Sequence, residues 1–185
     1  MTQENDAQYY EALLEISQTL NSIHEVDELL QRVMDIAIDT MHAERGFVMI
    51  QQPGKSDEFV TAVAYDIDPE NDMDDDSASR SVLQRVMEEQ EPVMTHNAPE
   101  DERFSGAESI IAQHIQSILA VPLKIKGELA GVIYLDSTKN RTRFTPRGLR
   151  FMEAFADQAA IAVDNANLIQ RKAHEAMALR NQMEE

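Results

Sequence analysis

The residues with the clearest potential for metal chemistry form an acidic run, Asp66–Asp76 (DIDPENDMDDD). Its alternating carboxylates are similar to the start of an EF-hand loop, whose carboxylate oxygens ligate calcium. However, Asn71 stands where that loop needs glycine, and Ser77 stands where it needs a bidentate glutamate. The run therefore predicts a solvated acidic loop rather than a calcium site.

Groups for catalysis are not found at a useful spacing. We find no paired carboxylates, no nucleophile–base pair, no glycine-rich phosphate loop and no histidine cluster with metal-ligand spacing. The chain has no cysteine, which excludes a disulfide, a thiolate nucleophile and a thiolate metal site. We therefore predict that the chain is not an enzyme and holds no metal.

Composition and charge restrict the remaining classes. The 185 residues fit one domain with helical extensions, and 43% hydrophobic residues are enough for a core. With 16 basic against 34 acidic residues the net charge is −18, which repels phosphate backbones, so no nucleic-acid partner is expected. No run approaches the roughly 18–20 apolar residues that span a bilayer, and the first residues do not form a signal peptide. These features predict a cytoplasmic protein without membrane insertion.

The elements that would position a site centre on one hairpin, Ser117–Asp136 (SILAVPLKIKGELAGVIYLD). Both arms are apolar on both faces, so both faces must be covered, and Lys126-Gly127 makes the turn. The other expected elements, in chain order, are a helix over 6–23, a second helix beginning near Asp27, strands Gly46–Gln51 and Glu58–Tyr65, a helix Ser81–Glu89, a strand Pro92–Thr95, short helix and loops over His96–Gln116, and a last helix from Pro146 to the chain end.

The two terminal helices carry apolar stripes at three- and four-residue steps, which is typical of helices that pack on partners. Beyond Asn165 the last helix has no sheet left to cover, yet apolar residues continue. Since an isolated helix of this length is marginal in water, we expect a homodimer. The residues predicted for its interface are Leu13, Ile16, Leu20, Leu168, Ile169 and Met177.

Five segments in this order resemble the GAF domain family of sensors: Ser79–Val93, Asp101–Ile110, Ser117–Leu123, Gly131–Ser137 and Phe144–Leu168. In the first, Gln90 stands where the family commonly has glycine. The resemblance implies an α/β (α+β) fold with a central antiparallel sheet of about five to six strands. Terminal helices would pack on one face, and pocket helices and loops on the other. We expect an N-terminal dimerisation helix over 1–24, the GAF domain over 25–165 and a signalling helix or coiled-coil extension over 166–185.

Departures from the family restrict the ligand, which the sequence leaves unknown. Relatives that bind bilin covalently, and the free methionine-sulfoxide reductases, both need cysteine, so these two chemistries are excluded. Cyclic-nucleotide relatives carry Asn-Lys and a later acidic pair, whereas this chain has Lys139-Asn140 and Gly148-Leu149, which argues against a cyclic nucleotide. His96 and His114 flank the implied pocket, but nothing in the sequence indicates a cavity large enough for haem, so haem is not expected.

The resemblance implies a ligand pocket lined by Val93, Thr95, Phe104, Ser109, Ile111, His114, Ser117, Leu119 and Tyr134. One hypothesis is a regulatory sensor that passes ligand state through its terminal helices to a covalently linked output domain. That domain could be a histidine kinase, a nucleotide cyclase, a phosphatase or an AAA+ transcriptional activator. The alternative is a ligand-free dimerisation and spacer module whose own side chains fill the pocket.

Overall fold

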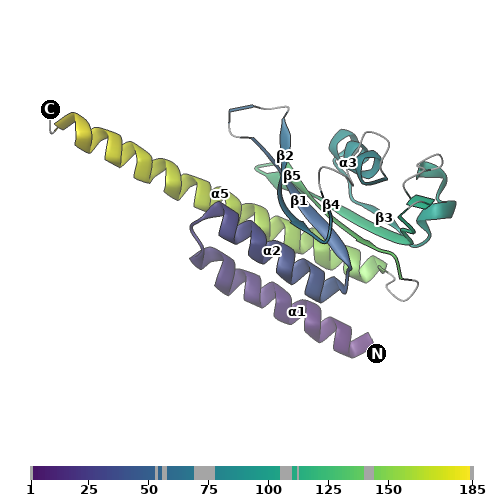
Figure 1. Cartoon of the computed structure of the whole chain (residues 1–185). Coiled ribbons are helices and arrows are strands. Elements are labelled where there is room, and N and C mark those ends of the chain that lie inside the picture. The colour runs from purple at the N-terminus through teal and green to yellow at the C-terminus, as the bar shows by residue number, and fades with distance from the viewer. Residues whose placement is uncertain are drawn as a thin grey trace.

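The computed structural model describes residues 2–52, 54–55, 58–68, 78–104, 110–111, 113–139 and 144–183, except for the side chains of residues 2–5 and 78. Within these residues the core element is an antiparallel sheet of five strands in the order β2-β1-β5-β4-β3 (Figure 1). The strands are β1 (Arg45–Gln51), β2 (Phe59–Tyr65), β3 (Val93–Thr95), β4 (Ser117–Ile125) and β5 (Glu128–Ser137). The predicted central hairpin is thus confirmed as β4–β5.

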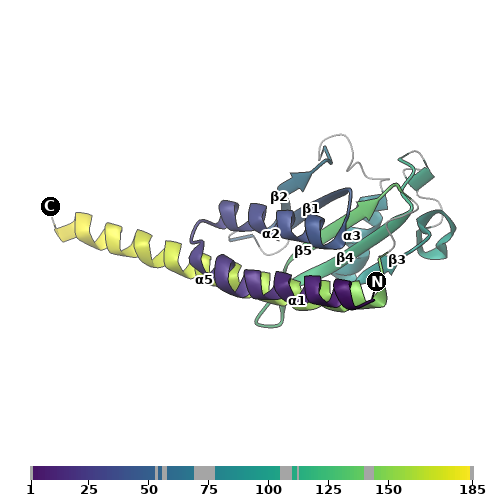
Figure 2. The ribbon, with the colours of Figure 1, turned by 90° about the horizontal axis from the view of Figure 1, so that it is seen from below.

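Helices cover the two faces of the sheet unequally. Three helices, α1 (Thr2–Thr19), α2 (Val26–Met41) and α5 (Pro146–Met183), lie together on one face (Figures 1 and 2). The other face carries α3 (Ala78–Glu89) and two short 3-10 turns, Ala98–Glu100 and Glu102–Phe104. A third 3-10 turn, Leu20–Ser22, follows α1 in the connection to α2. This arrangement confirms the predicted fold class, with the terminal helices on one face.

Side chains divide at the sheet because successive residues of a strand point to opposite faces. On the side of the terminal helices, the buried strand residues are Val48, Val63, Leu119, Val121, Leu123, Ile133 and Leu135. On the α3 side, the buried strand residues are Phe47, Val93, Ile118, Ala120, Val132 and Tyr134. Both faces of β4 and β5 are therefore buried from solvent, as their unbroken apolar runs predict.

Local sequence explains how the elements begin and turn. Thr145 caps α5, because its Oγ1 accepts a hydrogen bond from the Gly148 amide at 3.1 Å, and Pro146 occupies the first helical position. Lys126 and Gly127 both have left-handed φ, 53° and 82°, as a tight hairpin turn requires. At Gly131 a Cβ would lie 2.3 Å from a backbone oxygen of β1, so only glycine lets β1 and β5 approach there.

The final helix leaves the domain. Ala166 is its last buried residue, and residues 171–183 are all exposed. Figures 1 and 2 show this half of α5 extending past the rest of the chain. Among the described residues, no helix is both long enough and apolar enough to cross a membrane.

The packing of α1 against the rest of the protomer contradicts part of the predicted dimer interface. Ile16 and Leu20 are each 1% exposed and belong to the core beneath the terminal helices, so they are not available to a partner. Leu13 is partly buried against the same core. The sequence pattern alone does not distinguish an apolar stripe that packs against the core of its own chain from one that packs against a second copy. The other predicted interface residues, Leu168, Ile169 and Met177, are exposed.

Candidate functional site on the α3 face of the sheet

Four of the predicted pocket residues lie together on the α3 face. Val93, Phe104 and Tyr134 belong to the buried apolar cluster of that face. Thr95 is a buried polar residue, 6% exposed, and it lies two positions after Val93 on β3, so it points to the same side. The structure therefore brings together aromatic and apolar surface with a small number of hydroxyl groups, which is the composition expected of a small-molecule site.

Two predicted pocket residues on β4 are corrected. The side chain of Leu119 lies in the cluster on the opposite face, beneath α5. Ser117 is buried and lies two positions before Leu119, so strand alternation points it to that opposite face as well. The residues of β4 that lie on the α3 face are Ile118 and Ala120. Ala120 pairs with Val93 on one side and with Tyr134 on the other.

The remaining predicted pocket residues belong to the segment before β4. Ile111 is 72% exposed, and His114 is exposed with a left-handed φ of 55°. Neither side chain is therefore packed into the α3 face. Ser109 falls outside the described residues.

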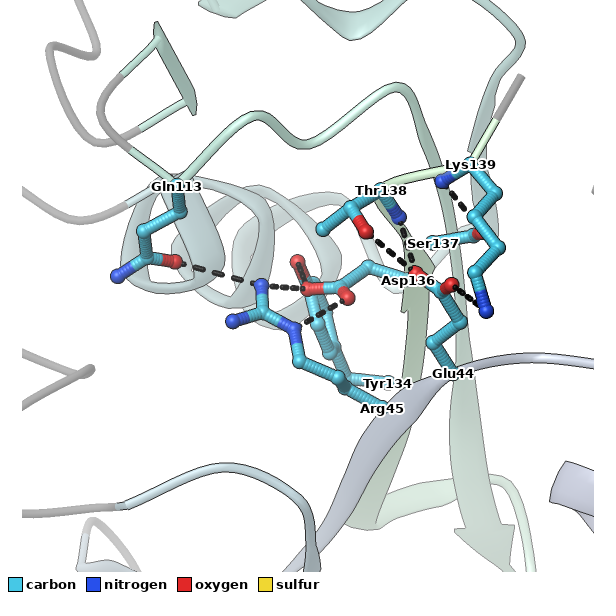
Figure 3. A network of polar contacts seen from close by, with 8 residues as sticks. All are labelled: Glu44, Arg45, Gln113, Tyr134, Asp136, Ser137, Thr138 and Lys139. Carbon is cyan, nitrogen blue, oxygen red and sulfur yellow. Dashed lines mark hydrogen bonds and ion pairs between the residues drawn. The ribbon is translucent and has the colours of Figure 1, made fainter.

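A buried polar network lies where β1 begins and β5 ends, beside this cluster (Figure 3). Arg45 Nε and Nη2 each donate a hydrogen bond of 2.8 Å to the Asp136 carboxylate, which forms a bidentate ion pair. The Tyr134 hydroxyl donates to Asp136 Oδ2 at 2.9 Å, and Arg45 Nη2 also donates to Gln113 Oε1 at 3.3 Å. The Asp136 side chain is fully buried and that of Arg45 is 14% exposed, so the pair fixes a charged carboxylate inside the protein.

Burial dominates the electrostatics of this network. Removal from water raises the pKa of Asp136, although the Arg45 guanidinium and the Tyr134 hydroxyl favour its charged form. Burial, reinforced by the adjacent Asp136 charge, raises the pKa of Tyr134 well above its usual value. Ser79, itself buried, also hydrogen-bonds the Tyr134 hydroxyl. Tyr134 therefore stays a neutral hydrogen-bond donor, and its ring stacks on Phe47 with centroids 4.7 Å apart.

Next to the network, Glu44 joins the start of β1 to the segment after β5. Its Oε2 accepts hydrogen bonds from the Thr138 amide and hydroxyl, both at 2.6 Å, and its Oε1 lies 2.9 Å from Lys139 Nζ (Figure 3). Burial opposes ionisation of Glu44, but these donors together outweigh it and lower the pKa to about 2. The carboxylate is therefore charged at neutral and mildly acidic pH.

A second polar cluster holds the turns after β3. Arg103 pairs with Asp101 at 2.6 Å, and its Nη2 also donates to the Met94 carbonyl oxygen at 2.8 Å. The hydrogen bond from Arg103 is the main reason that the pKa of Asp101 falls to about 2, and Thr95 also donates to that carboxylate. The guanidinium lies 5.4 Å from the centre of the Phe104 ring. This cluster fixes the predicted pocket residues Thr95 and Phe104 to the edge of the sheet.

Sequence reasoning did not find the Arg45–Asp136 pair. The two residues are 91 positions apart, and they meet because the β1–β5 register places Arg45 directly opposite Asp136. An arginine opening one apolar strand and an aspartate closing another was the available signal, but it becomes readable only when the strand order is known. Within the described part of the chain, no group of three or more histidine, aspartate or glutamate residues could hold a metal ion.

About half of the chain is similar in sequence to part of a signalling protein. The chain is 27% identical over 88 residues to hybrid signal transduction histidine kinase G of Dictyostelium discoideum; the match covers 48% of this chain and 3% of that protein. The chain thus spans a small fraction of this relative's length.

Solved structures are similar in fold. The GAF domain of a phosphoenolpyruvate-protein phosphotransferase from Coxiella burnetii superposes with a TM-score of 0.69 at 16% identity, covering 89% of this chain and 98% of that one. Free methionine-R-sulfoxide reductase from Neisseria meningitidis gives 0.69 at 14% identity, with 87% and 91% covered. The GAF domain of a putative sensor histidine kinase from Pseudomonas syringae pv. tomato gives 0.62 at 13% identity, with 92% and 96% covered.

The family model for the GAF domain matches residues 23–164, which run from the connection before α2 to the buried part of α5. Because this match spans most of the chain and agrees with the sheet order and helix placement, the chain belongs to the GAF domain family.

Proposed function

We propose that this chain is the regulatory module of a multidomain signalling protein and that it passes the state of the α3 face to an output domain through α5. The similarity to a hybrid histidine kinase and to the GAF domain of a putative sensor histidine kinase supports this role. A non-enzymatic role for the module is consistent with the lack of cysteine, which removes thiol chemistry.

The observation that carries the proposal is that β5 contributes both to the polar network and to the core beneath α5. Tyr134 and Asp136 point to the α3 side of β5, whereas Ile133 and Leu135 pack in the core that includes α5. One strand therefore separates the candidate site from the output helix. A shift of β5 that accommodates a ligand would also move Ile133 and Leu135, and with them the core that holds α5.

The ligand in this proposal is a small molecule bound among Val93, Thr95, Phe104 and Tyr134. Its polar groups would meet the hydroxyls of Thr95 and Tyr134, and its apolar part would meet the aromatic rings. A ligand can shift the arrangement of the terminal helices only if it binds one arrangement more tightly than the other. Because these four residues are packed at 0–6% exposure, binding requires the α3 face to open.

This close packing also favours the second candidate function, a ligand-free dimerisation and spacer module. Tyr134 stacks on Phe47, and neither side chain is exposed. In that case the polar network serves only to fix the register of β1 and β5. The two candidates differ in whether a molecule occupies the α3 face, so they can be separated by direct measurement.

For the homodimer, the exposed apolar residues suggest a face that differs in part from the sequence prediction. Tyr10 and Leu14 are 66% and 45% exposed on α1, while Ile161 and Leu168 are 54% and 39% exposed on α5. The two α5 residues are seven positions apart, which places them on nearly the same side of the helix. We propose that this face, continued by the exposed half of α5, meets the same face of a second copy.

The test uses the fact that the chain has no cysteine, so that one introduced cysteine is the only site for a thiol-reactive label. Native mass spectrometry of the purified chain should reveal a dimer carrying about one co-purified small molecule per subunit. A single cysteine introduced by Glu175→Cys, on the exposed half of α5, then takes a spin label whose distance to its copy is measured before and after the molecule is removed. A change in that distance supports coupling to α5.

Two variants of Ala120 complete the test, because this residue lies between Val93 and Tyr134 on the α3 face. Ala120→Leu adds volume among the pocket residues, so it should block binding and hold the label distance at its ligand-free value. Ala120→Ser is nearly the size of the parent residue and should keep the response. A dimer with no bound molecule, and no response to a metabolite collection in thermal unfolding, would favour the spacer function. A monomer would refute the proposed helix interface.

A further inference from the structure

A hollow lies on the side of the sheet opposite α3, where α5 departs from the sheet. The cavity has a volume of about 850 Å³ and is lined by α5, by the end of the β4–β5 hairpin and by residues at the end of β1. This volume is within the range of small-molecule sites. It is separate from the α3 face, since its lining includes Leu123 and Val163 from the core beneath α5.

The floor and the rim of this cavity differ in chemistry. The floor is apolar and is formed by Ile50, Leu123, Ile125, Ala160 and Val163. The rim along α5 presents amide and basic groups from Asn167, Gln170, Arg171 and His174. Across the cavity the rim has Lys55, which pairs with Glu58 at 2.9 Å, and the single carboxylate Glu128.

The two basic side chains of the α5 rim are Arg171 and His174. Gln170 donates to Glu25 at 3.2 Å, but neither Arg171 nor His174 has an ion-pair partner among the described residues. They are three residues apart and so lie on one side of the helix. In a chain of net charge −18, an arginine above an apolar floor that has no ion-pair partner in the described part of the chain is a local exception, and it favours a negatively charged head group.

We propose that this cavity binds an amphipathic carboxylate, with an unbranched apolar tail on the floor and its head group against Arg171 and His174. Arginine suits such a head group because its planar guanidinium can donate two parallel hydrogen bonds to a carboxylate. The tail would lie between the hairpin and α5 at the point where Val163 is the last of the floor residues on the helix. Binding there stabilises one direction of α5 as it leaves the sheet, which makes the cavity a second input at a site separate from the α3 face.

The experiment measures binding of dodecanoate to the whole chain by isothermal titration calorimetry, below the concentration at which dodecanoate forms micelles. Dodecanol, which has the same tail without the charge, serves as the ligand control. We expect saturable binding of one dodecanoate per chain and at least tenfold weaker binding of dodecanol. The double variant Arg171→Gln with His174→Gln should weaken dodecanoate about tenfold or more.

Matched variants separate binding in this cavity from general attraction of an anion to α5. Lys172→Gln removes a positive charge from the same turn of α5, but Lys172 does not line the cavity, so the variant should bind dodecanoate as tightly as the parent chain. Ile125→Glu places a carboxylate at the floor, where the parent residue is only partly buried, and should abolish binding while the circular dichroism spectrum stays unchanged.

Three results would overturn the proposal. These are the lack of saturable dodecanoate binding, equal weakening by Lys172→Gln, and loss of binding in Ala120→Leu, which would move the site to the α3 face. Conversely, failure of the sensor role on the α3 face leaves the dodecanoate result unaffected, because Ala120 lies across the sheet from the cavity. The two proposals can therefore fail separately.

Discussion

Glu44→Gln offers the sharpest test of the electrostatics that join β1 to the segment after β5. The replacement keeps the shape of the side chain but removes the charge that accepts two hydrogen bonds from Thr138 and pairs with Lys139. The pKa of Glu44 falls from 4.5 to about 2 on folding, a difference of 4.5 − 2 or about 2.5 pH units. At about 1.36 kcal/mol per unit the upper limit is about 3.4 kcal/mol. Since Lys139 is 74% exposed and screened by water and salt, we expect about 1–2 kcal/mol.

The pH dependence follows from the direction of the shift. A carboxyl whose pKa is lower in the folded state stabilises that state fully above its unfolded pKa and loses the effect as the pH falls through its folded pKa. The window for Glu44 therefore runs from pH 4.5 down to about 2. The difference in unfolding free energy between parent and variant should be nearly constant from pH 7 to about 5, and by about pH 3 it should have fallen by roughly half or more.

The assay is urea unfolding followed by circular dichroism at several pH values between neutrality and the lower end of that window, with Glu128→Gln as a control. Glu128 is exposed at the start of β5, so its replacement should change stability by less than about 0.5 kcal/mol at every pH. A loss for Glu44→Gln that is independent of pH would show that the carboxylate acts through shape rather than charge. A loss below about 0.5 kcal/mol at neutral pH would refute the reasoning altogether.

Three further replacements, each measured by urea unfolding, test a buried ion pair, a residue with left-handed φ and the close approach of β1 to β5. Arg45→Met should cost about 3 kcal/mol at neutral pH by leaving the Asp136 carboxylate buried, and adding Asp136→Leu should recover most of this; equal losses would contradict the ion-pair argument. The raised pKa of Asp136 means that the Arg45→Met loss should shrink as the pH falls and the carboxyl takes up a proton. Gln90→Gly should raise stability by about 0.5–1 kcal/mol, because Gln90 holds a left-handed φ of 54°, and an unchanged midpoint would count against it. Gly131→Ala should cost about 2 kcal/mol or more, since its Cβ would meet the Met49 carbonyl oxygen at 2.3 Å, and a neutral result would contradict the β1–β5 approach.

The fold was largely predictable because its strongest signals are local. The β4–β5 hairpin has two apolar arms and a Lys126-Gly127 turn, and the last helix has Pro146 at its start. Gln90 shows how far a family pattern reaches: the position where glycine is common does adopt left-handed φ, and here a glutamine accepts that conformation.

The site was less predictable because it depends on which face a residue points to. In an arm that is apolar almost throughout, the pattern does not tell which of two alternating sets faces the helices, so Ser117 and Leu119 were placed on the wrong side and Ala120 was missed. The Arg45–Asp136 pair depends on strand order and register, which are non-local properties. The sequence predicted the apolar stripe on α1, but it could not tell whether the stripe packs within the protomer or against a second copy. Ile16 of that stripe belongs to the protomer core.

The two proposed inputs have a common physical basis in the way α5 is held. Its first half is buried against the sheet, and its second half, from 171 onward, is exposed and gains nothing from the sheet. The direction of such a helix is set by the buried residues of its last turns against the sheet, which here include Ala160 and Val163. These two residues also line the cavity proposed to bind a carboxylate. A ligand on the α3 face would act on these residues through the strands, whereas a tail in the cavity would touch them directly. If both inputs operate, their effects on the α5 label distance should be coupled, because they act on the same few helix residues.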